Sequence, residues 1–363
     1  MAVKKSDDIL IIGAGVFGLS TALELTKRGY SNITVLDRHV PPIVDGSSVN
    51  SRIIRADYAD PVYSQMALEA YKGWTSTYSD FYHQSGKPTF LPHRATTTPV
   101  AGVSFITGPR GTVDSLRNSS NRVVGVNFAD GRHLLASQVI LATGAWSSRL
   151  LDLSHTASSS GQPVGFIQLT PAEASKFAQT PVMINMTTGV FSFPPTPGTN
   201  ILKIARHGYG YATETPSEAT GRLVSGPRRN SSNAASGYLP DDADAALRDG
   251  LRQLFPSLGD RPWSNRRLCW YTDTPTGDFI IDRHPVMDGL FVATGGAGHA
   301  FKFLPILGKY VADCFENRAS SELRQKWKLK PLTKESGPVV MAGDGSRGGP
   351  PLRKLSVFEQ SKL

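Results

Sequence analysis

The sequence is poor in cysteine, with only Cys269 and Cys314 in 363 residues, and the two lie far apart. Such a pair is too sparse to form the disulfide framework of a small secreted domain. Long hydrophobic runs are also lacking, so no segment reaches the length that spans a bilayer. The first residues include Lys4 and Lys5 and carry no apolar signal segment. We therefore expect no membrane partner and no secretory route, and the three Asn-x-Ser/Thr sequons predict no glycosylation.

Blocks of like charge are lacking as well. Lysine and arginine number 39 against 30 aspartate and glutamate residues, a net charge of +9 that is spread along the chain. This balance favours anionic ligands, but without a basic block it predicts no nucleic-acid partner. The 39% hydrophobic and 9% aromatic content is ordinary for a protein with a buried core. The length allows two interleaved lobes, and no metal site is expected.

The N-terminal segment has the pattern of a dinucleotide-binding unit. Ile9–Ile12 is a short apolar strand, the glycine-rich run Gly13–Gly18 follows it, and a helix then continues to about Arg28. The next strand, Ile33–Leu36, ends at Asp37. The glycines allow a tight turn, the approach of a pyrophosphate and close packing of the helix on the strand, and the acid suits the adenosine ribose hydroxyls. A glycine-rich turn without a ligand is the alternative.

Two later glycine-rich turns bear on the choice between FAD and NAD. Leu141–Trp146 is a strand that ends in a turn of small residues, and Ala293–His299 is a second such turn between a strand and a helix. The second turn is suited to hold the edge of an isoalloxazine ring near a helix N-terminus. Together with the first turn they favour a two-part FAD lobe. An NAD-dependent dehydrogenase is the alternative, which a yellow colour of the purified protein would exclude.

The middle of the chain predicts a second lobe inserted into the first. From about 165 to 262 the texture changes to short alternating strands and turns, with an amphipathic helix expected over Asp241–Phe255. We therefore predict an α/β fold. A discontinuous Rossmann-like FAD lobe of the glutathione-reductase type takes residues 1–164 and 264–325, and a substrate lobe with a mixed or antiparallel sheet takes residues 165–263.

Residues 326–363 are predicted to form a C-terminal tail. Beyond Arg324 the composition is basic and rich in glycine and proline, so we expect this segment to be loosely ordered. The chain ends in Ser361-Lys362-Leu363, the tripeptide that is read at a free C-terminus as a peroxisomal address. This ending predicts a peroxisomal location, with the peroxisomal import receptor as a partner.

Several runs resemble one known family. Ser51–Tyr58, Cys269–Thr272, Phe279–Asp282 and Gly298–Lys302 are similar to segments of the sarcosine oxidase and fungal fructosyl amino acid oxidase family. The L-pipecolate and L-saccharopine oxidases belong to the same group. Each run alone is a weak signal, but their combination is specific. The resemblance extends over most of the chain, roughly residues 7–86 and 120–315.

The resemblance implies FAD-dependent oxidation of the C–N bond of a secondary amine or N-substituted amino acid. A hydride passes from the carbon beside a neutral amine to the flavin, and the resulting imine hydrolyses to a carbonyl compound and an amine. Oxygen takes the electrons as hydrogen peroxide. The implied partners are therefore a small amine or amino-acid derivative and oxygen. The resemblance also implies that FAD is bound covalently through Cys269, whereas Cys314 stays structural.

The same resemblance assigns roles to four catalytic candidates. Lys203 corresponds to a lysine over the flavin that activates oxygen, because a fixed cation stabilises superoxide. A solvated lysine on an edge strand is the alternative. Arg55 and Lys302 correspond to positions that hold the substrate carboxylate. His299 lies beside the flavin and tunes its charge, or is simply hydrogen-bonded within its turn.

The cofactor-binding candidates come from the three turns and from the runs that carry the resemblance. For Arg52 an ion pair with Asp57 or with a flavin phosphate is sufficient explanation. The complete set is Gly13, Gly15, Val16, Phe17, Gly18, Asp37, Arg38, Ser47, Ser48, Arg52, Ala142, Gly144, Trp146, Cys269, Gly296, Gly298, His299 and Lys302.

The sequence also departs from the family. Members are longer by many tens of residues, and the shortfall falls just after Gly86, where 87–100 replaces an expected strand and helical region. His207 stands where the fructosyl amino acid oxidases have an acid, and Trp327–Lys330 differs from their Trp-Arg-Trp-Arg run. The changes at His207 and at Trp327–Lys330 argue against a fructosyl amino acid as substrate. The departures together leave two alternatives open: a secondary-metabolism flavin oxidoreductase acting on an amino-acid-derived intermediate, and a shortened flavin-binding relative without oxidase turnover.

Overall fold

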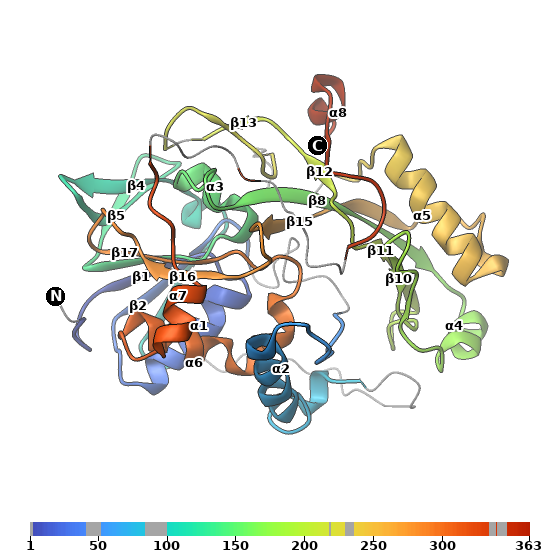
Figure 1. Ribbon diagram of the computed structural model, residues 1–363, viewed down its shortest axis with the longest axis horizontal. Helices are drawn as coiled ribbons and strands as arrows, with labels where there is room; N and C mark the ends of the chain where they lie inside the picture. The colour runs from blue at the N-terminus through green and yellow to red at the C-terminus, as the bar shows by residue number, and fades with distance from the viewer. Residues whose placement is uncertain are drawn as a thin grey trace.

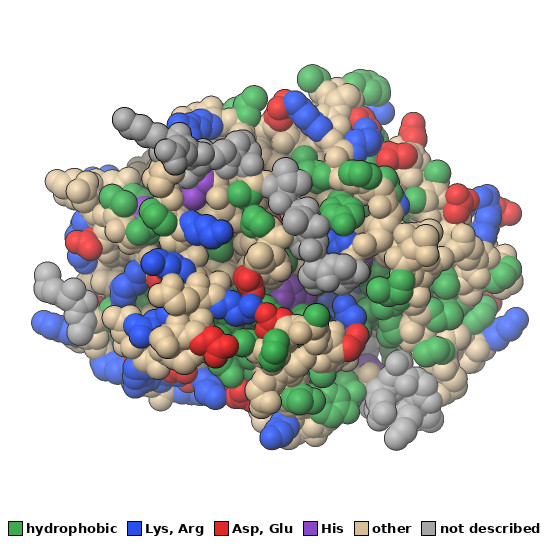
Figure 2. All heavy atoms as spheres, viewed as in Figure 1, with side chains coloured by type: hydrophobic (Ala, Val, Ile, Leu, Met, Phe, Trp, Pro, Cys, Tyr) green, Lys and Arg blue, Asp and Glu red, His purple; other side chains and the backbone are tan. Residues whose placement is uncertain are grey.

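The structure, a computed structural model, describes residues 3–40, 52–83, 100–217, 219–228, 236–333, 339 and 347–363. Within these residues two large sheets lie side by side, and the long strands of the second sheet run back toward the first (Figure 1). Acidic and basic side chains are interspersed over the face shown in Figure 2, as the scattered charges of the sequence predict. No helix of the described residues has the length and apolar character needed to cross a membrane.

The first sheet is the predicted dinucleotide-binding sheet. Its order is β16-β17-β7-β1-β2-β3, and all neighbours are parallel except β16, which runs antiparallel to β17. The α/β class and the Rossmann-like lobe are thereby confirmed. The strand bounds are β1 Ile9–Ile12, β2 Ile33–Asp37, β3 Val103–Thr107, β7 Gln138–Leu141, β16 Ile280–Arg283 and β17 Leu290–Thr294.

Both faces of the first sheet are covered, which explains its continuously apolar strands. Because side chains alternate along a strand, Ile9 and Ile11 pack with the helices, whereas Leu10 and Ile12 pack with a small three-stranded sheet. The helices are α1 Val16–Lys27, α2 Pro61–Trp74 and α6 Leu304–Phe315. The small sheet consists of β4 Val113–Ser119, β5 Arg122–Phe128 and β6 His133–Leu135. Helix α2 begins after Asp60, whose carboxylate accepts hydrogen bonds from the amides of Val62 and Tyr63 in the first turn.

The second sheet contains seven strands in the order β18-β12-β8-β11-β10-β9, with β15 also paired to β8. Leu202 and Ile204 of β11 bury one face of this sheet against helix α5, Asp241–Leu254, which lies where the amphipathic pattern predicts it. The other face is turned toward the glycine-rich turns. The strand bounds are β8 Ser158–Gln168, β9 Met183–Ile184, β10 Val190–Ser192, β11 Ile201–Arg206, β12 Tyr211–Ala212, β15 Asn265–Asp273 and β18 Arg353–Lys354.

The sheets divide the chain differently from the predicted lobe boundaries of 165–263 and 264–325. Strand β8 already begins at Ser158, and β15 pairs with β8 along its whole length, so both belong to the second sheet. This second sheet is called the substrate-side sheet below. Strand β18, in the predicted tail, also belongs to it. An alternating strand pattern shows that a strand exists but not which sheet it joins, so the sequence did not indicate the sheet membership of these strands.

The prediction of a loosely ordered tail over 326–363 is wrong for the described residues. Trp327 and Leu329 are buried in the first lobe, and Trp327 Nε1 donates a hydrogen bond to the Tyr63 hydroxyl at 3.1 Å. Helix α8, Val357–Ser361, begins with a capping box between Ser356 and Glu359. Composition alone indicated disorder, because it carries no information on contacts with segments far away in the chain.

Candidate active site

The first glycine-rich turn has the geometry that a bound pyrophosphate requires. Gly13 has a φ of +105°, and a Cβ on it would lie 2.5 Å from the Ala142 carbonyl oxygen, so only glycine fits. A Cβ on Gly18 would lie 1.8 Å from the Gly13 carbonyl oxygen, so this glycine allows α1 to pack closely on β1. Gly15 is the N-cap of α1, which places the positive end of the helix at the turn.

Asp37 at the end of β2 holds this turn in place. Its Oδ2 accepts a hydrogen bond from the Ala14 amide at 2.7 Å, and its Oδ1 accepts one from the His39 amide at 2.8 Å. Burial raises the pKa of Asp37, and these two hydrogen bonds oppose the rise. Beside it, the guanidinium of Arg38 lies over the Trp146 ring at 4.2 Å from the centroid. An acid, a cation and an aromatic ring thus meet at one end of the site, a set suited to an adenosine.

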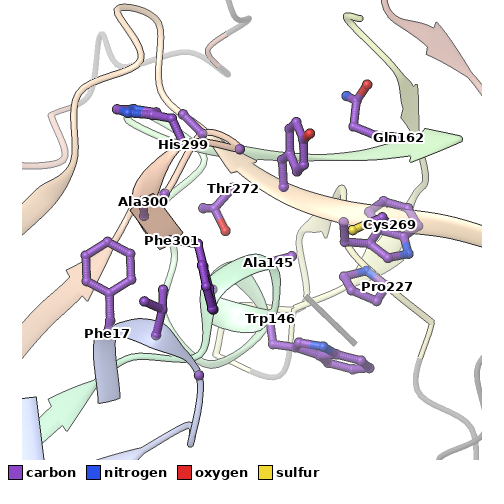
Figure 3. Close-up of a pocket in the computed structure, with 18 of the residues that line it drawn as sticks. Phe17, Ala145, Trp146, Gln162, Pro227, Cys269, Thr272, His299, Ala300 and Phe301 are labelled. Carbon is purple, nitrogen blue, oxygen red and sulfur yellow. The ribbon is translucent and has the colours of Figure 1, made fainter. Parts of the chain in front are cut away.

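One cavity of about 380 Å³ joins the glycine-rich turns to the second sheet (Figure 3). Its size falls in the usual range for cofactor and ligand pockets. In the described part of the chain, every predicted site residue lines this cavity except Gly18, whose place is at the strand–helix contact. Ser47 and Ser48 lie outside the described residues. The cavity brings together side chains from both lobes, which the linear sequence separates widely.

The wall opposite the turns is one face of the second sheet. Alternate residues along three strands point to it: Gln162 and Val164 of β8, Lys203 of β11, and Cys269 and Tyr271 of β15. Cys269 is the cross-strand partner of Gln162. Figure 3 shows these two side chains together at one side of the pocket, with Phe17 of α1 on the far side. The period of two therefore presents the lysine and the cysteine to the same space.

Lys203 is buried rather than solvated. Only 6% of the residue is exposed, and its Nζ lies 4.8 Å from the Phe193 ring centroid. Burial lowers the pKa of Lys203 to about 7, and the nearby Arg52 guanidinium also lowers it. The alternative of a solvated lysine on an edge strand is wrong, because β11 lies inside the sheet between β8 and β10.

Of the two arginines in the Ser51–Tyr58 run, Arg55 rather than Arg52 pairs with Asp57. Arg55 Nη1 forms the ion pair with Asp57 Oδ2 at 2.7 Å, and about a third of the Arg55 side chain is exposed. Arg52 instead lies with its guanidinium 5.1 Å from the Phe301 ring centroid. Burial lowers the pKa of Arg52. The ion pair with Asp57 therefore does not explain Arg52, which is enclosed next to Cys269 and Lys203.

Lys302 and His299 meet at Tyr58, a cavity residue whose role the sequence analysis missed. The Lys302 Nζ lies 4.6 Å from the Tyr58 ring centroid, and the lysine residue is 6% exposed. His299 Nε2 is 2.8 Å from the Gly277 carbonyl oxygen, so it must donate that hydrogen bond. In the neutral ring Nδ1 then accepts from the Tyr58 hydroxyl at 2.9 Å. Both ring nitrogens of His299 are thus engaged in hydrogen bonds, and Tyr58 is the group that this histidine orients.

Three further cavity residues were not identified from the sequence, and two of them, Gln162 and Arg149, carried no local signal. Gln162 lies in a run of small polar residues, and Arg149 lies on the short helix α3, Ser147–Leu150, which follows the Leu141–Trp146 turn. The third, Tyr271, lies inside the Cys269–Thr272 run, but the sequence analysis assigned it no role of its own. A signal existed for Tyr271, since a residue two positions from Cys269 on a strand must share its face.

The described residues fit a flavin dinucleotide. Glycine turns whose space a Cβ would fill, a helix N-terminus and a ribose-side acid lie at one end of the cavity, and buried cations lie at the other. Among the described residues no cluster of three or more His, Cys, Asp or Glu side chains could hold a metal ion. The arrangement suits a bound redox cofactor with an anionic substrate beside it.

Comparison with protein families and curated proteins agrees with this geometry. The model of the FAD dependent oxidoreductase family matches residues 8–87 and 100–314, with its interruption in the segment after Gly86. L-saccharopine oxidase of Schizosaccharomyces pombe is 29% identical, over 91% of this chain and 95% of that protein. Monomeric sarcosine oxidase of a Bacillus species is 25% identical, over 84% and 92%. The first alignment runs over 416 residues and so exceeds the 363 residues of this chain, which lacks segments that the relative has.

Solved structures share the whole architecture. The fructosamine oxidase Amadoriase II from Aspergillus fumigatus is 27% identical with a TM-score of 0.79, over 97% of this chain and 96% of that one. A thermally stable mutant of fructosyl peptide oxidase is 26% identical with a TM-score of 0.81, over 97% and 98%. The chain thus has the fold of these oxidases over nearly its full length.

Proposed function

The chain belongs to the FAD dependent oxidoreductase family, and on that premise we propose that it oxidises the C–N bond of a secondary amine with oxygen as acceptor. The family membership removes the NAD-dependent dehydrogenase from consideration. One observation carries the proposal: buried Lys203 and partly accessible Cys269 share one sheet face, across the cavity from the glycine-rich turns. FAD held at the glycine-rich turns would supply the redox chemistry, namely acceptance of a hydride from the carbon beside the amine nitrogen and transfer of the electrons to oxygen as hydrogen peroxide.

The substrate side of the cavity favours an amino-acid-derived amine. Arg55 and Lys302 together offer a planar guanidinium and an ammonium, which suit a carboxylate. The Tyr58 hydroxyl, 2.9 Å from His299 Nδ1, lines the same cavity. His207, which also lines the cavity, replaces the acid of the fructosyl amino acid oxidases. We therefore favour an N-substituted amino acid without a sugar, in line with the name of the saccharopine-oxidising relative.

The remaining steps require only a neutral amine, water and oxygen. The amine must be neutral when its α-hydrogen leaves as hydride, and the product imine adds water and separates into a carbonyl compound and an amine. Lys203 is buried and would supply a positive charge beside the cofactor, where it would stabilise the superoxide formed as oxygen is reduced. The peroxisomal location predicted from Ser361–Leu363 suits a peroxide producer and stays a prediction.

Covalent attachment of FAD through Cys269 is part of the proposal. Its thiol lines the cavity and is partly accessible, with Arg52 and Lys203 as neighbours. Cys314 is the matched contrast, since it is buried on α6 and burial raises its pKa to about 12. A thiol of that kind is inert at neutral pH.

The test is the distribution of flavin after acid precipitation. In the wild type and in Cys314→Ser the yellow colour should stay with the pellet, whereas in Cys269→Ser it should move to the supernatant. An amine panel read out as peroxide then tests turnover. Colour found wholly in the wild-type supernatant would refute covalent attachment, and a colourless protein would refute flavin binding itself.

A second candidate rests on the shortened segment. The alignment with the saccharopine-oxidising relative requires residues that this chain lacks, and the family match is interrupted between 87 and 100. Residues 84–99 lie outside the described part. A flavin-binding relative without oxidase turnover would be yellow, yet no amine would bleach its flavin under anaerobic conditions. The bleaching experiment separates the two candidates directly.

A further inference from the structure

A fully buried ion pair ties the C-terminal segment to the substrate-side sheet. The Arg347 side chain is 1% exposed and that of Asp273, at the end of β15, is 3% exposed. Arg347 Nη2 donates to Asp273 Oδ1 at 2.5 Å, and Nη1 donates to Asp273 Oδ2 at 3.1 Å. Nη1 also donates to the Gly208 carbonyl oxygen at 3.1 Å. A bidentate guanidinium–carboxylate pair of this kind fixes both groups in orientation as well as in distance.

The pair continues as a closed hydrogen-bond ring that reaches the cavity. Asp273 Oδ2 accepts from the Ser160 hydroxyl at 2.5 Å, and that hydroxyl accepts from Gln162 Nε2 at 2.9 Å. Gln162 Oε1 accepts from the Gly208 amide at 3.1 Å, which closes the ring at the residue that Arg347 also contacts. Arg347 Nη1 donates to two acceptors of the ring, and Asp273 Oδ2 accepts from two of its donors. Gln162 lines the cavity opposite Cys269 on the neighbouring strand, so the ring sets the orientation of its amide.

The backbone of the same segment holds further parts of the cavity wall. The Gly348 amide donates to the His207 carbonyl oxygen at 3.1 Å, and a Cβ on Gly348 would lie 2.4 Å from the Gly189 nitrogen. The Arg347 guanidinium lies 5.6 Å from the Tyr271 ring centroid. The Tyr271 ring also packs on Gly298, where a Cβ would lie 2.4 Å from the ring. The segment therefore contacts the His207 loop and Tyr271, both of which line the cavity.

We propose that Arg347 is a positioning residue for amine oxidation, holding Gln162, Tyr271 and the His207 loop around the cofactor site through its pair with Asp273. The inference rests on the proposed function. It assigns the C-terminal segment to the active site rather than to a tail. The chemistry of the pair supports positioning over simple stabilisation, because apolar residues of similar volume usually replace a buried ion pair without loss of stability. What apolar residues cannot replace is the directed hydrogen-bond ring that ends at Gln162.

The test separates positioning from folding by using a single and a double variant. Arg347→Met leaves Asp273 buried without its partner, so the thermal midpoint should fall by several degrees. The double variant Arg347→Met/Asp273→Leu removes both charges and should recover most of that midpoint. Arg353→Met is the matched control, since Arg353 lies on the same segment in more exposed pairs with Asp242 and Glu359.

Two readouts follow the cavity itself: visible circular dichroism of the bound flavin, and kcat/KM with the best amine. Both Arg347 variants should show an altered dichroism spectrum and a kcat/KM lower by about 10- to 100-fold, as expected for a sub-ångström misplacement of reacting groups. The Arg353 control should match the wild type. A double variant with wild-type dichroism and kcat/KM overturns the proposal and leaves the pair purely structural. The dichroism needs no turnover, so a wild type that oxidises no amine refutes the proposed function while Arg347 is still tested.

Discussion

Replacing Lys203 by methionine should have two effects of opposite sign, a loss of oxygen reactivity and a gain in stability. Methionine keeps the length and volume of the side chain but removes the charge of a buried residue that is only 6% exposed. Burial, with Arg52 as a further cause, lowers the pKa of Lys203 from 10.5 to about 7. The wild-type chain therefore carries a free-energy cost that a neutral side chain avoids.

The size and pH dependence of that cost follow from the two pKa values. At about 1.4 kcal/mol per pH unit, a fall from 10.5 to about 7 costs the apoprotein about 5 kcal/mol below pH 7. Between these values the unfolded chain binds the proton and the folded chain does not, so wild-type stability rises with pH. The gain from Lys203→Met should thus be largest below about pH 7, shrink by about 1.4 kcal/mol per unit above it and vanish near 10.5.

Urea unfolding of the apoprotein across this pH range measures the gain. The Cys269→Ser background, which is expected to release its flavin, provides apoprotein with and without Lys203. A gain that is absent in mild acid, or that does not change with pH, would show that the lysine is not held at a lowered pKa and would refute the reasoning.

The holoenzyme tests the functional half of the same prediction by stopped flow. Anaerobic flavin reduction by a good substrate should be nearly unchanged in Lys203→Met. Reoxidation should slow by about 10²- to 10³-fold, since one preorganised charge in a dry site contributes about 3–4 kcal/mol. If only the reductive half-reaction is impaired, Lys203 belongs to the substrate site and its proposed role in oxygen reduction is wrong.

The remaining predictions concern the carboxylate-binding residues Arg55 and Lys302 and the C-terminal tripeptide Ser361–Leu363. Arg55→Met or Lys302→Met should weaken flavin reduction by a carboxylate-bearing amine while leaving reoxidation unchanged. Flavin reduction by an amine without a carboxylate should be unaffected by either substitution. Equal losses with the two amines would show that Arg55 and Lys302 do not bind the carboxylate. Deleting Ser361–Leu363 should turn a punctate fluorescent fusion cytosolic. Identical distributions of the intact and shortened fusions would show that the tripeptide is not read as an address.

The sequence by itself determined the cofactor lobe, because its signals are local. Gly13 has a φ of +105° and Gly18 contacts the Gly13 carbonyl oxygen, and both requirements arise within one strand–turn–helix unit. Ile9–Ile12 is apolar throughout because both faces of its sheet are covered. Asp37 follows from the end of the next strand. The runs around Cys269 and His299 added the family, which the comparisons confirm. Periodicity, turn chemistry and motif spacing all act over a few residues, so a linear reading captures them.

Only the tertiary structure decided how distant segments meet. β15 joins the substrate-side sheet through pairing with β8, and Asp57 pairs with Arg55 rather than Arg52. The predicted tail places Trp327 in the core and Arg347 against Asp273. Lys203 is buried because strands lie on both sides of β11. Ion-pair partners, sheet membership and burial depend on contacts between residues far apart in the chain, and composition and period carry no information on those contacts.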